Sequence, residues 1–399
     1  MKQIFTVFFL AIAILASAQN KTNKSAASRY EVDTIPLVYD LIGQVDTGQF
    51  MPVVRHLSSY STRKCTTQQA IMAQNWLKDQ FDSLGIQVEL QDFPLYGGSP
   101  CSDNVIATLP GYVHPDEYIV VGGHYDSYTY TGLAPGADDN ASGTSGVMEL
   151  ARILKNYAFE RSIIFCAFSA EELGLIGSEY YATKAKQSGM DILGYFNFDM
   201  IGYLNPGDEI HTDMIAPSSA QQLVDFYTNV AAVYLPDFSV EEAEAIGGDS
   251  DHTSFNNHGY MGIFPFEDTP NYSPYIHTPN DVIGLSFNSP EMAKKFIQAN
   301  LASVATLAVP YDSTVSIPPT REITHNIVLF PNPVRDLVSI SNDKGEPMLV
   351  SINNISGQTL LKMTVNGQKT IDLSSLKPGL YCIVCTGDNF TETLKMVKR

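Results

Sequence analysis

One stretch, residues 120–143, constrains the fold of this chain more than any other; it reads VVGGHYDSYTYTGLAPGADDNASG. An apolar run at residues 118–121 ends at two glycines, and His124 and Asp126 follow at once. A turn-rich loop then brings Asp138 and Asp139 to the start of an amphipathic stretch. This pattern predicts a buried strand, a loop and a helix. Open α/β sheets place their functional sites at this carboxyl edge of a strand.

Strand and helix patterns alternate on both sides of this stretch. Further strands are predicted at residues 86–93, 104–109, 162–168, 195–200 and 262–266. Helices are predicted at residues 66–84, 142–157, 178–187, 220–235 and 289–308, with Ser178 and Ser289 as N-caps of the third and the last. The alternation indicates an α/β fold at residues 36–310, with a mixed, largely parallel sheet sandwiched by helices.

The two ends of the chain have different patterns. Residues 1–18 read as a signal peptide, with Lys2, an apolar core and Ala-Ser-Ala before Gln19, and a flexible N-terminal segment follows at residues 19–35. A Ser/Thr/Pro-rich linker at 311–325 precedes short strands at 338–340, 348–352, 359–365, 381–384 and 391–397. Residues 326–399 are therefore predicted to form a small C-terminal β-sandwich.

Charge and cysteine content narrow the setting in which the protein works. The net charge of −19 argues against a nucleic-acid partner and against an anionic membrane surface. Export makes disulfides plausible, and Cys65 and Cys101 lie in turn-like surroundings and could pair. Cys166 lies in an apolar run and is expected to be buried, whereas Cys382 and Cys385 should point to opposite faces of one strand.

Five residues of metal-ligand type follow apolar strands or lie in turns. They are His124, Asp138, Glu172, Asp199 and His277. One histidine near one aspartate is weak evidence, but two histidines with three carboxylates are what a two-metal hydrolase needs. One carboxylate would bridge the ions, and each ion would take one histidine and one further carboxylate. The ions would share a water molecule and acidify it.

The pair Glu171-Glu172 follows the apolar strand at 162–168 directly. Neighbouring side chains in extended structure point in opposite directions, so one could bind metal while the other faces the water. An exposed acidic pair is the alternative interpretation. The next residues, Leu-Gly-Leu-Ile-Gly, favour a buried functional pair.

These residues, taken together, resemble the secreted bacterial leucyl aminopeptidase family of co-catalytic zinc peptidases, within the glutaminyl cyclase/glutamate carboxypeptidase superfamily. The resemblance covers roughly residues 35–310, and its motifs are His-x-Asp at 124, Gly-Ala-Asp-Asp-Asn-Ala-Ser-Gly at 136, Glu-Glu at 171, Asn-Phe-Asp-Met at 197 and Ile-His-Thr at 276. Ser-Asp-His at 250 and Pro-Phe-Glu at 265 also look like family segments. A departure is the stretch Ala-Ile-Gly-Gly-Asp at 245–249, where relatives often carry a tyrosine between paired cysteines.

The resemblance implies a role for each site residue. His124 and Asp199 would hold one Zn²⁺, Glu172 and His277 the other, and Asp138 would bridge them. It also implies Glu171 as the general base, Asp126 as the residue that orients His124, and Asp139 as a further residue of the outer shell. The non-proline cis peptide of the family would follow Asp138.

The C-terminal segment resembles the type IX secretion sorting domain. The matching segments are Phe-Pro-Asn-Pro at 330, Asn-Ile-Ser-Gly at 354, Leu-Lys-Pro-Gly-Leu-Tyr at 376 and the basic end Lys-Met-Val-Lys-Arg. The resemblance implies the type IX secretion machinery as a partner and delivery to the medium or the outer-membrane surface. A carbohydrate-binding or spacer β-sandwich is the alternative.

The leading hypothesis is a secreted zinc aminopeptidase, acting as a monomer on peptides with a free N-terminus and an apolar first residue. A glutaminyl cyclase of the same superfamily, with one zinc, is the first alternative, although such enzymes lack the Asp-Asp-Asn run found at 138–140. A carboxypeptidase of related fold would need an arginine cluster for the substrate carboxylate, and no obvious one is present. A metal-free binding module should have lost ligands or the base, and this chain has all six residues.

Overall fold

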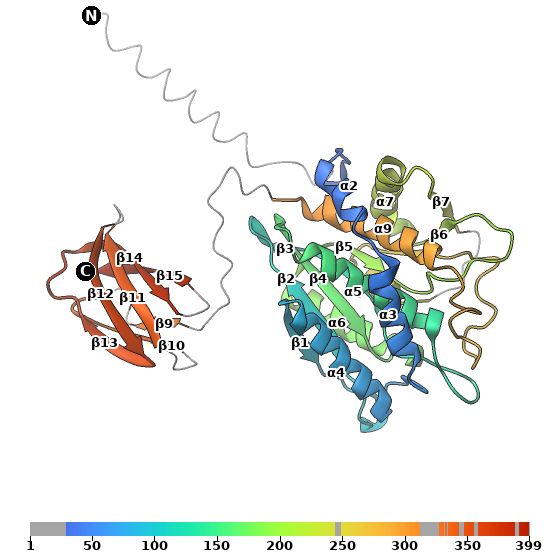
Figure 1. The fold of residues 1–399 in the computed structure, drawn as a ribbon, viewed down its shortest axis with the longest axis horizontal. Helices are drawn as coiled ribbons and strands as arrows, with labels where there is room; N and C mark the ends of the chain where they lie inside the picture. The colour runs from blue at the N-terminus through green and yellow to red at the C-terminus, as the bar shows by residue number, and fades with distance from the viewer. Residues whose placement is uncertain are drawn as a thin grey trace, which may run out of the picture. The chain divides into compact units, whose positions relative to one another are not determined.

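The computed structural model describes residues 29–243, 249–311, 327–330, 332, 334–342, 347–354, 358–387 and 391–398. The chain divides into two compact units, Met1–Asp312 and Ser313–Arg399 (Figure 1). The predicted signal peptide and nearly all of the predicted linker lie outside the described residues. Within the described part, no helix has both the length and the apolar character that a membrane span requires.

The first unit is built on one eight-stranded sheet, in the order β1-β2-β4-β3-β5-β8-β6-β7. The strands are β1 (Gln87–Gln91), β2 (Asn104–Leu109), β3 (His114–His124), β4 (Arg161–Phe168), β5 (Asp191–Asn197), β6 (His211–Ile215), β7 (Ser239–Glu242) and β8 (Gly262–Phe266). The four central strands β4, β3, β5 and β8 are mutually parallel, and antiparallel pairs lie on both sides of them. The predicted mixed, largely parallel sheet is confirmed.

Helices cover both faces of this sheet (Figure 1). One face packs against α2 (Pro36–Ile42), α3 (Thr47–Ser58), α4 (Gln68–Ser83), α5 (Gly143–Leu154), α7 (Gln221–Tyr234) and α9 (Pro290–Ala308). The other packs against α6 (Ile176–Ser188) and α8 (His252–Asn257). The alternation of β3 divides its side chains between the faces, with Ile119 and Val121 in the larger core and Val120 in the smaller.

The helix termini show where local sequence signals suffice and where they do not. Ser289 caps α9 as predicted, because its hydroxyl accepts a hydrogen bond from the Met292 amide. Ser178 does not cap α6, which begins two residues earlier after Leu175 in left-handed conformation. The Ser178 hydroxyl instead donates to the Leu175 carbonyl oxygen. The elements α2, α3, α8, β6 and β7 had no prediction.

The second unit consists of two antiparallel sheets, β13-β10-β9 and β12-β11-β14-β15. Its strands are β9 (Ile327–Phe330), β10 (Leu337–Asn342), β11 (Pro347–Asn354), β12 (Thr359–Asn366), β13 (Gln368–Asp372), β14 (Gly379–Thr386) and β15 (Thr391–Lys398). Alternate residues of these strands, such as Val338, Ile340, Val350 and Ile352, form one apolar core. A small antiparallel β-unit is thus present where the sequence pattern predicted it.

The cysteines follow their sequence surroundings. Cys65 and Cys101 form a disulfide that closes a sequence separation of 36 residues. Cys166 is buried in β4. On β14, Cys382 is exposed and Cys385 is buried, so the two point to opposite faces of the strand.

Candidate metal centre

The candidate site lies at the carboxyl ends of the parallel strands β4, β3 and β5. His124 is the last residue of β3, and its side chain is buried. The residue before it, Gly123, must be glycine for steric reasons, because a Cβ there would lie 2.1 Å from the Phe198 carbonyl oxygen. Glycine at this position therefore allows the segment that carries Asp199 to pass directly over the end of β3.

The turn before α5, Ala137–Ser142, delivers the aspartates of the Asp-Asp-Asn run. The Asn140 side chain fixes this turn: its Nδ2 donates to the Phe198 carbonyl oxygen at 2.8 Å, and its Oδ1 accepts from the Gly143 amide at 2.8 Å. The peptide bond between Asp139 and Asn140 is cis. The expected cis bond is present, but it lies one residue later than predicted.

Two histidines approach the same carboxylate from opposite sides. His124 Nε2 lies 3.3 Å from Asp139 Oδ1, and His277 Nε2 lies 3.1 Å from Asp139 Oδ2. Each histidine has a second carboxylate of its own: His124 Nε2 lies 3.4 Å from Asp199 Oδ1, and His277 Nε2 lies 2.9 Å from Glu172 Oε2. The result is two groups of three metal-ligand side chains that share Asp139.

The prediction that Asp138 lies between the two histidines is wrong, because Asp139 occupies that place. The Asp138 side chain points away, and its Oδ1 accepts a hydrogen bond from the Gly202 amide at 2.9 Å. The physical reason is the irregular backbone of the turn, in which Asp139 has φ −105° and ψ 89°. Neighbouring side chains therefore diverge, and only the second aspartate faces the histidines.

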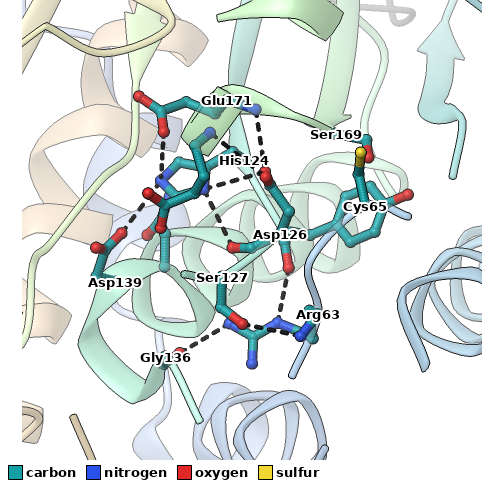
Figure 2. A network of polar contacts seen from close by, with 12 residues as sticks. Arg63, Cys65, His124, Asp126, Ser127, Gly136, Asp139, Ser169 and Glu171 are labelled. Atoms are coloured by element: carbon teal, nitrogen blue, oxygen red, sulfur yellow. Dashed lines mark hydrogen bonds and ion pairs between the residues drawn. The ribbon is translucent and has the colours of Figure 1, made fainter. Parts of the chain in front are cut away.

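Asp126 connects the ring of His124 to the segment after β4 (Figure 2). Its Oδ1 lies 3.4 Å from His124 Nδ1, and its backbone oxygen lies 3.2 Å from the same nitrogen. The Glu171 and Glu172 amides donate to the Asp126 carboxylate at 3.2 and 3.4 Å. With acceptors at Nδ1, the proton of a neutral imidazole belongs there, which leaves the lone pair on Nε2 to face the carboxylates.

Three residues that contact the site residues, or the backbone beside them, were not predicted from the sequence to belong to the site. Ser250, in the Ser-Asp-His motif, donates through Oγ to Asp199 Oδ2 at 2.8 Å. Asp281 accepts from the Asp138 and Asp139 amides at 2.9 and 3.1 Å. Arg63 lies beneath the His124 loop (Figure 2). Proximity to a recognised motif could have identified Ser250, but nothing in the sequence pattern marks Arg63.

Burial and charge shift the titration of the site residues. Hydrogen bonds to Asp139 and Glu172 raise the pKa of His277 to about 11, and burial raises the pKa of Glu172 to about 8. Burial alone would lower the pKa of His124, but the charges of Glu171 and Asp199 outweigh it and raise that pKa well above its usual value. The cluster thus retains protons that a metal ion would displace on binding.

The donor set fits divalent metal ions. Three buried atoms of the ligand residues have no hydrogen-bond partner among the described residues, and each belongs to one of the two ligand groups. They are His124 Nε2, Asp199 Oδ1 and Glu172 Oε1. Buried polar atoms are rarely left without partners. Imidazole nitrogens together with carboxylate oxygens are typical ligands of zinc and similar ions.

Comparison with known proteins places the chain in a family. Residues 104–301 match the family model described as peptidase family M28. A probable leucine aminopeptidase of Arthroderma otae is 30% identical over 273 residues, which cover 63% of this chain and 71% of that protein. The chain belongs to peptidase family M28. Residues 328–399 match a second model, the secretion system C-terminal sorting domain.

Solved structures share the fold of the peptidase unit. LapB from Legionella pneumophila is 26% identical with a TM-score of 0.63, over 77% of this chain and 83% of that one. A glutaminyl cyclase of Bacteroides thetaiotaomicron is 20% identical with a TM-score of 0.55, over 65% of this chain and 98% of that one. The second likeness concerns the fold alone, so the fold does not separate an M28 aminopeptidase from a cyclase.

Proposed function

We propose that this M28 metallopeptidase is a secreted aminopeptidase that holds two Zn²⁺ ions and removes an apolar N-terminal residue from peptides. The observation that carries the proposal is the pair of three-residue groups that share Asp139. In this assignment His124, Asp139 and Asp199 hold one ion, and Asp139, Glu172 and His277 hold the other. A single-zinc cyclase would have no use for the second group.

Bound there, the two ions would supply Lewis-acid activation of the attacking water and of the scissile carbonyl. Glu171 would act as the general base. Its side chain is 11% exposed, and its Oε2 lies 3.9 Å from His124 Nε2, so it reaches the centre of the cluster. Burial raises the pKa of Glu171 well above its usual value, which favours a carboxylate able to accept and return a proton near neutral pH.

An apolar cluster next to both ligand groups supports the substrate preference. Met200 follows Asp199, Ile276 precedes His277, and both pack with Phe264 and Phe266. A first side chain bound there would be apolar. The substrate amine would lie near the carboxylates of Glu171 and Asp199, and the net charge of −19 favours the approach of a cation.

The sorting domain and the N-terminal pattern support export. The proposal includes removal of the signal peptide near Ala18 and delivery to the cell surface or the medium through the type IX machinery. It also includes independent folding of the two units on either side of residues 311–325.

Metal analysis and a small substrate panel test the function. The purified protein should contain about two zinc ions per chain. Treatment with 1,10-phenanthroline should abolish cleavage of leucyl anilide, and added zinc should restore it. Equal cleavage of N-acetyl-leucyl anilide would rule out an aminopeptidase, and cyclisation of a glutaminyl peptide without hydrolysis of leucyl anilide would favour the cyclase.

The general base has its own test. Glu171→Gln should keep both zinc ions, because the ligand groups are intact, and should lower kcat by roughly 10²–10⁴-fold, because the amide cannot take a proton. Unchanged kcat at full zinc content would remove Glu171 from this role.

A further inference from the structure

Arg63 is a fully buried cation close to the candidate metal centre. The residue lies on the segment that connects α3 to α4, and its exposed fraction is 0%. A charge in the interior is costly unless it is fully hydrogen-bonded. Burial lowers the pKa of Arg63 to about 10, so the guanidinium remains protonated at neutral pH. The position therefore demands a strong structural reason for a charged residue.

The guanidinium donates four hydrogen bonds, and every acceptor is a backbone carbonyl oxygen. Nε donates to Tyr125 at 2.7 Å, and Nη2 donates to Gly136 at 2.8 Å. Nη1 donates to Leu57 at 2.8 Å and to Pro135 at 2.5 Å. The planar, forked shape of the group allows one side chain to reach all four oxygens.

Two of these acceptors, Tyr125 and Gly136, lie at the two ends of the loop that separates the ligand-bearing segments; Figure 2 shows Arg63 beside Gly136. Tyr125 lies between His124 and Asp126, and Gly136 directly precedes the turn that carries Asp139. One rigid group thus connects the backbone beside His124 to the backbone before Asp139. These two side chains approach each other to 3.3 Å.

The backbone around Arg63 is adapted to this contact. Gly136 has φ +55°, and a Cβ there would lie 2.7 Å from Arg63 Nη2 and 2.4 Å from the Asp139 carbonyl oxygen. Glycine is therefore needed both for the conformation and for the close approach. The Arg63 amide also donates to Ser127 Oγ at 2.9 Å, which in turn donates to the Ala134 carbonyl oxygen at 2.8 Å.

The turn that carries Asp139 is held from its other side by an anion. The two carboxylate oxygens of Asp281 accept the amides of Asp138 and Asp139. Arg63 binds the Pro135 and Gly136 carbonyl oxygens just before the turn, so a cation and an anion hold consecutive peptide units of the same backbone segment. Neither group belongs to the two ligand groups described above.

We propose that Arg63 is a positioning residue for the metal centre, which fixes the separation of His124 and Asp139 by holding the Tyr125 and Gly136 carbonyl groups. The proposal rests on the proposed two-zinc function. Lysine cannot replace arginine here, because a single ammonium group cannot span acceptors on three separate segments. Loss of the guanidinium should thus weaken zinc binding in protein that is still folded.

A purely structural role makes a different prediction. In that case Arg63 would contribute to the stability of the fold, and its replacement would lower the melting temperature without changing zinc affinity in the folded fraction. The experiment must therefore measure zinc affinity and stability separately.

The test compares wild type, Arg63→Lys, Arg63→Met and the control Phe226→Leu, which alters a buried apolar contact in α7. Zinc affinity is measured by competition with a chromogenic chelator, and melting temperature by circular dichroism. Both Arg63 variants should bind zinc about 10–100-fold more weakly, as is typical when an outer-shell partner is lost. The control should melt at a lower temperature and keep wild-type zinc affinity.

Kinetics at saturating zinc give a second measurement. The Arg63 variants should have lower kcat for leucyl anilide with little change in KM, because the apolar cluster proposed to bind the first side chain is untouched. Wild-type zinc affinity and kcat in Arg63→Lys would overturn the proposal, whatever its melting temperature. If neither Arg63 variant folds, Ser127→Ala decides: a few-fold loss of zinc affinity supports the proposal, and no loss overturns it.

The outcomes separate this inference from the proposed function. If wild type fails to bind two zinc ions, the proposed function fails irrespective of Arg63. If wild type binds two ions and the Arg63 variants bind them equally well, only the positioning role fails.

Discussion

The two halves of the candidate centre are built in different ways. The half formed by His124 and Asp199 lies at the ends of neighbouring parallel strands, and the two side chains are 1% and 10% exposed. In the other half, His277 lies on a loop and Glu172 lies in a short 3-10 helix, Glu171–Leu173, just after β4; the two side chains are 28% and 6% exposed. Strand ends position both residues of the first half, whereas in the second half they position only Glu172, and the place of His277 depends on contacts between loops.

The contacts that support each half differ accordingly. In the buried half, Asn197 Nδ2 donates to Ser250 Oγ, which donates to Asp199 Oδ2, and both distances are 2.8 Å. In the loop half, the His277 carbonyl oxygen accepts from Thr129 Oγ1 at 3.3 Å and from the Tyr130 amide at 3.4 Å. The rings of Tyr128 and Tyr130 pack edge-on against the His277 ring. The buried half should therefore tolerate less change than the loop half.

The largest expected effect comes from the one residue that both halves share. Asp139→Asn should lose both zinc ions and all measurable turnover, because each ligand group contains Asp139. Asp138→Asn makes the same change of charge one residue earlier and is the matched control. Its side chain faces the Gly202 amide, so it should keep two ions with affinity reduced by at most about 10–100-fold. Metal analysis after gel filtration checks both, and the reverse result would restore Asp138 as the bridge.

The confusion of Asp138 with Asp139 shows where sequence reasoning reaches its limit. Apolar runs predict the strands, and the ends of those strands predict the places of His124 and the Glu171-Glu172 pair. This works because the pattern of apolar residues indicates which segments are buried strands. The turn at 137–142 has no such period, so the residue type was predictable and the direction of each side chain was not. The Arg63 guanidinium binds only backbone carbonyl groups. Every residue has such a group, so the sequence does not indicate which residues Arg63 contacts. The strands β6 and β7 had no prediction because their sequences, HTDMI and SVEE, contain few apolar residues, whereas β8, GIFPF, was predicted from its apolar run.

A smaller effect concerns the pH dependence of stability and tests whether water is excluded from the buried half. His252 follows Ser250 and Asp251, is 3% exposed and packs against Phe264 with ring centroids 5.2 Å apart. Burial lowers the pKa of His252 to about 4. The unfolded chain takes up this proton near pH 6.5 and the native chain does so only near pH 4. The stability should therefore fall as pH falls through this window, by roughly 3 kcal/mol in total.

His252→Gln removes this contribution. Urea unfolding in EDTA at pH 7 and pH 4.5 should show a shallower loss of stability in the variant than in wild type. His114→Gln, at an exposed position, is the control and should lose as much stability as wild type. Equal losses in all three proteins would mean that water reaches His252, and the buried half would then be less dry than its exposed fraction indicates.

The smallest effect tests the comparison directly, by deleting one hydroxyl from each half. Ser250→Ala leaves Asp199 Oδ2 and Asn197 Nδ2 without their partner in the interior, and zinc affinity should fall by about tenfold or more. Thr129→Val removes a longer hydrogen bond in a half-buried loop, while the Tyr130 amide still donates to the same carbonyl oxygen. Its cost should be only about two- to threefold. Stepwise chelator competition, which resolves the weaker ion from the tighter one, measures both variants. Equal losses of zinc affinity in the two variants would contradict the comparison. They would show that burial of the supporting hydroxyl does not determine how much it contributes to zinc affinity.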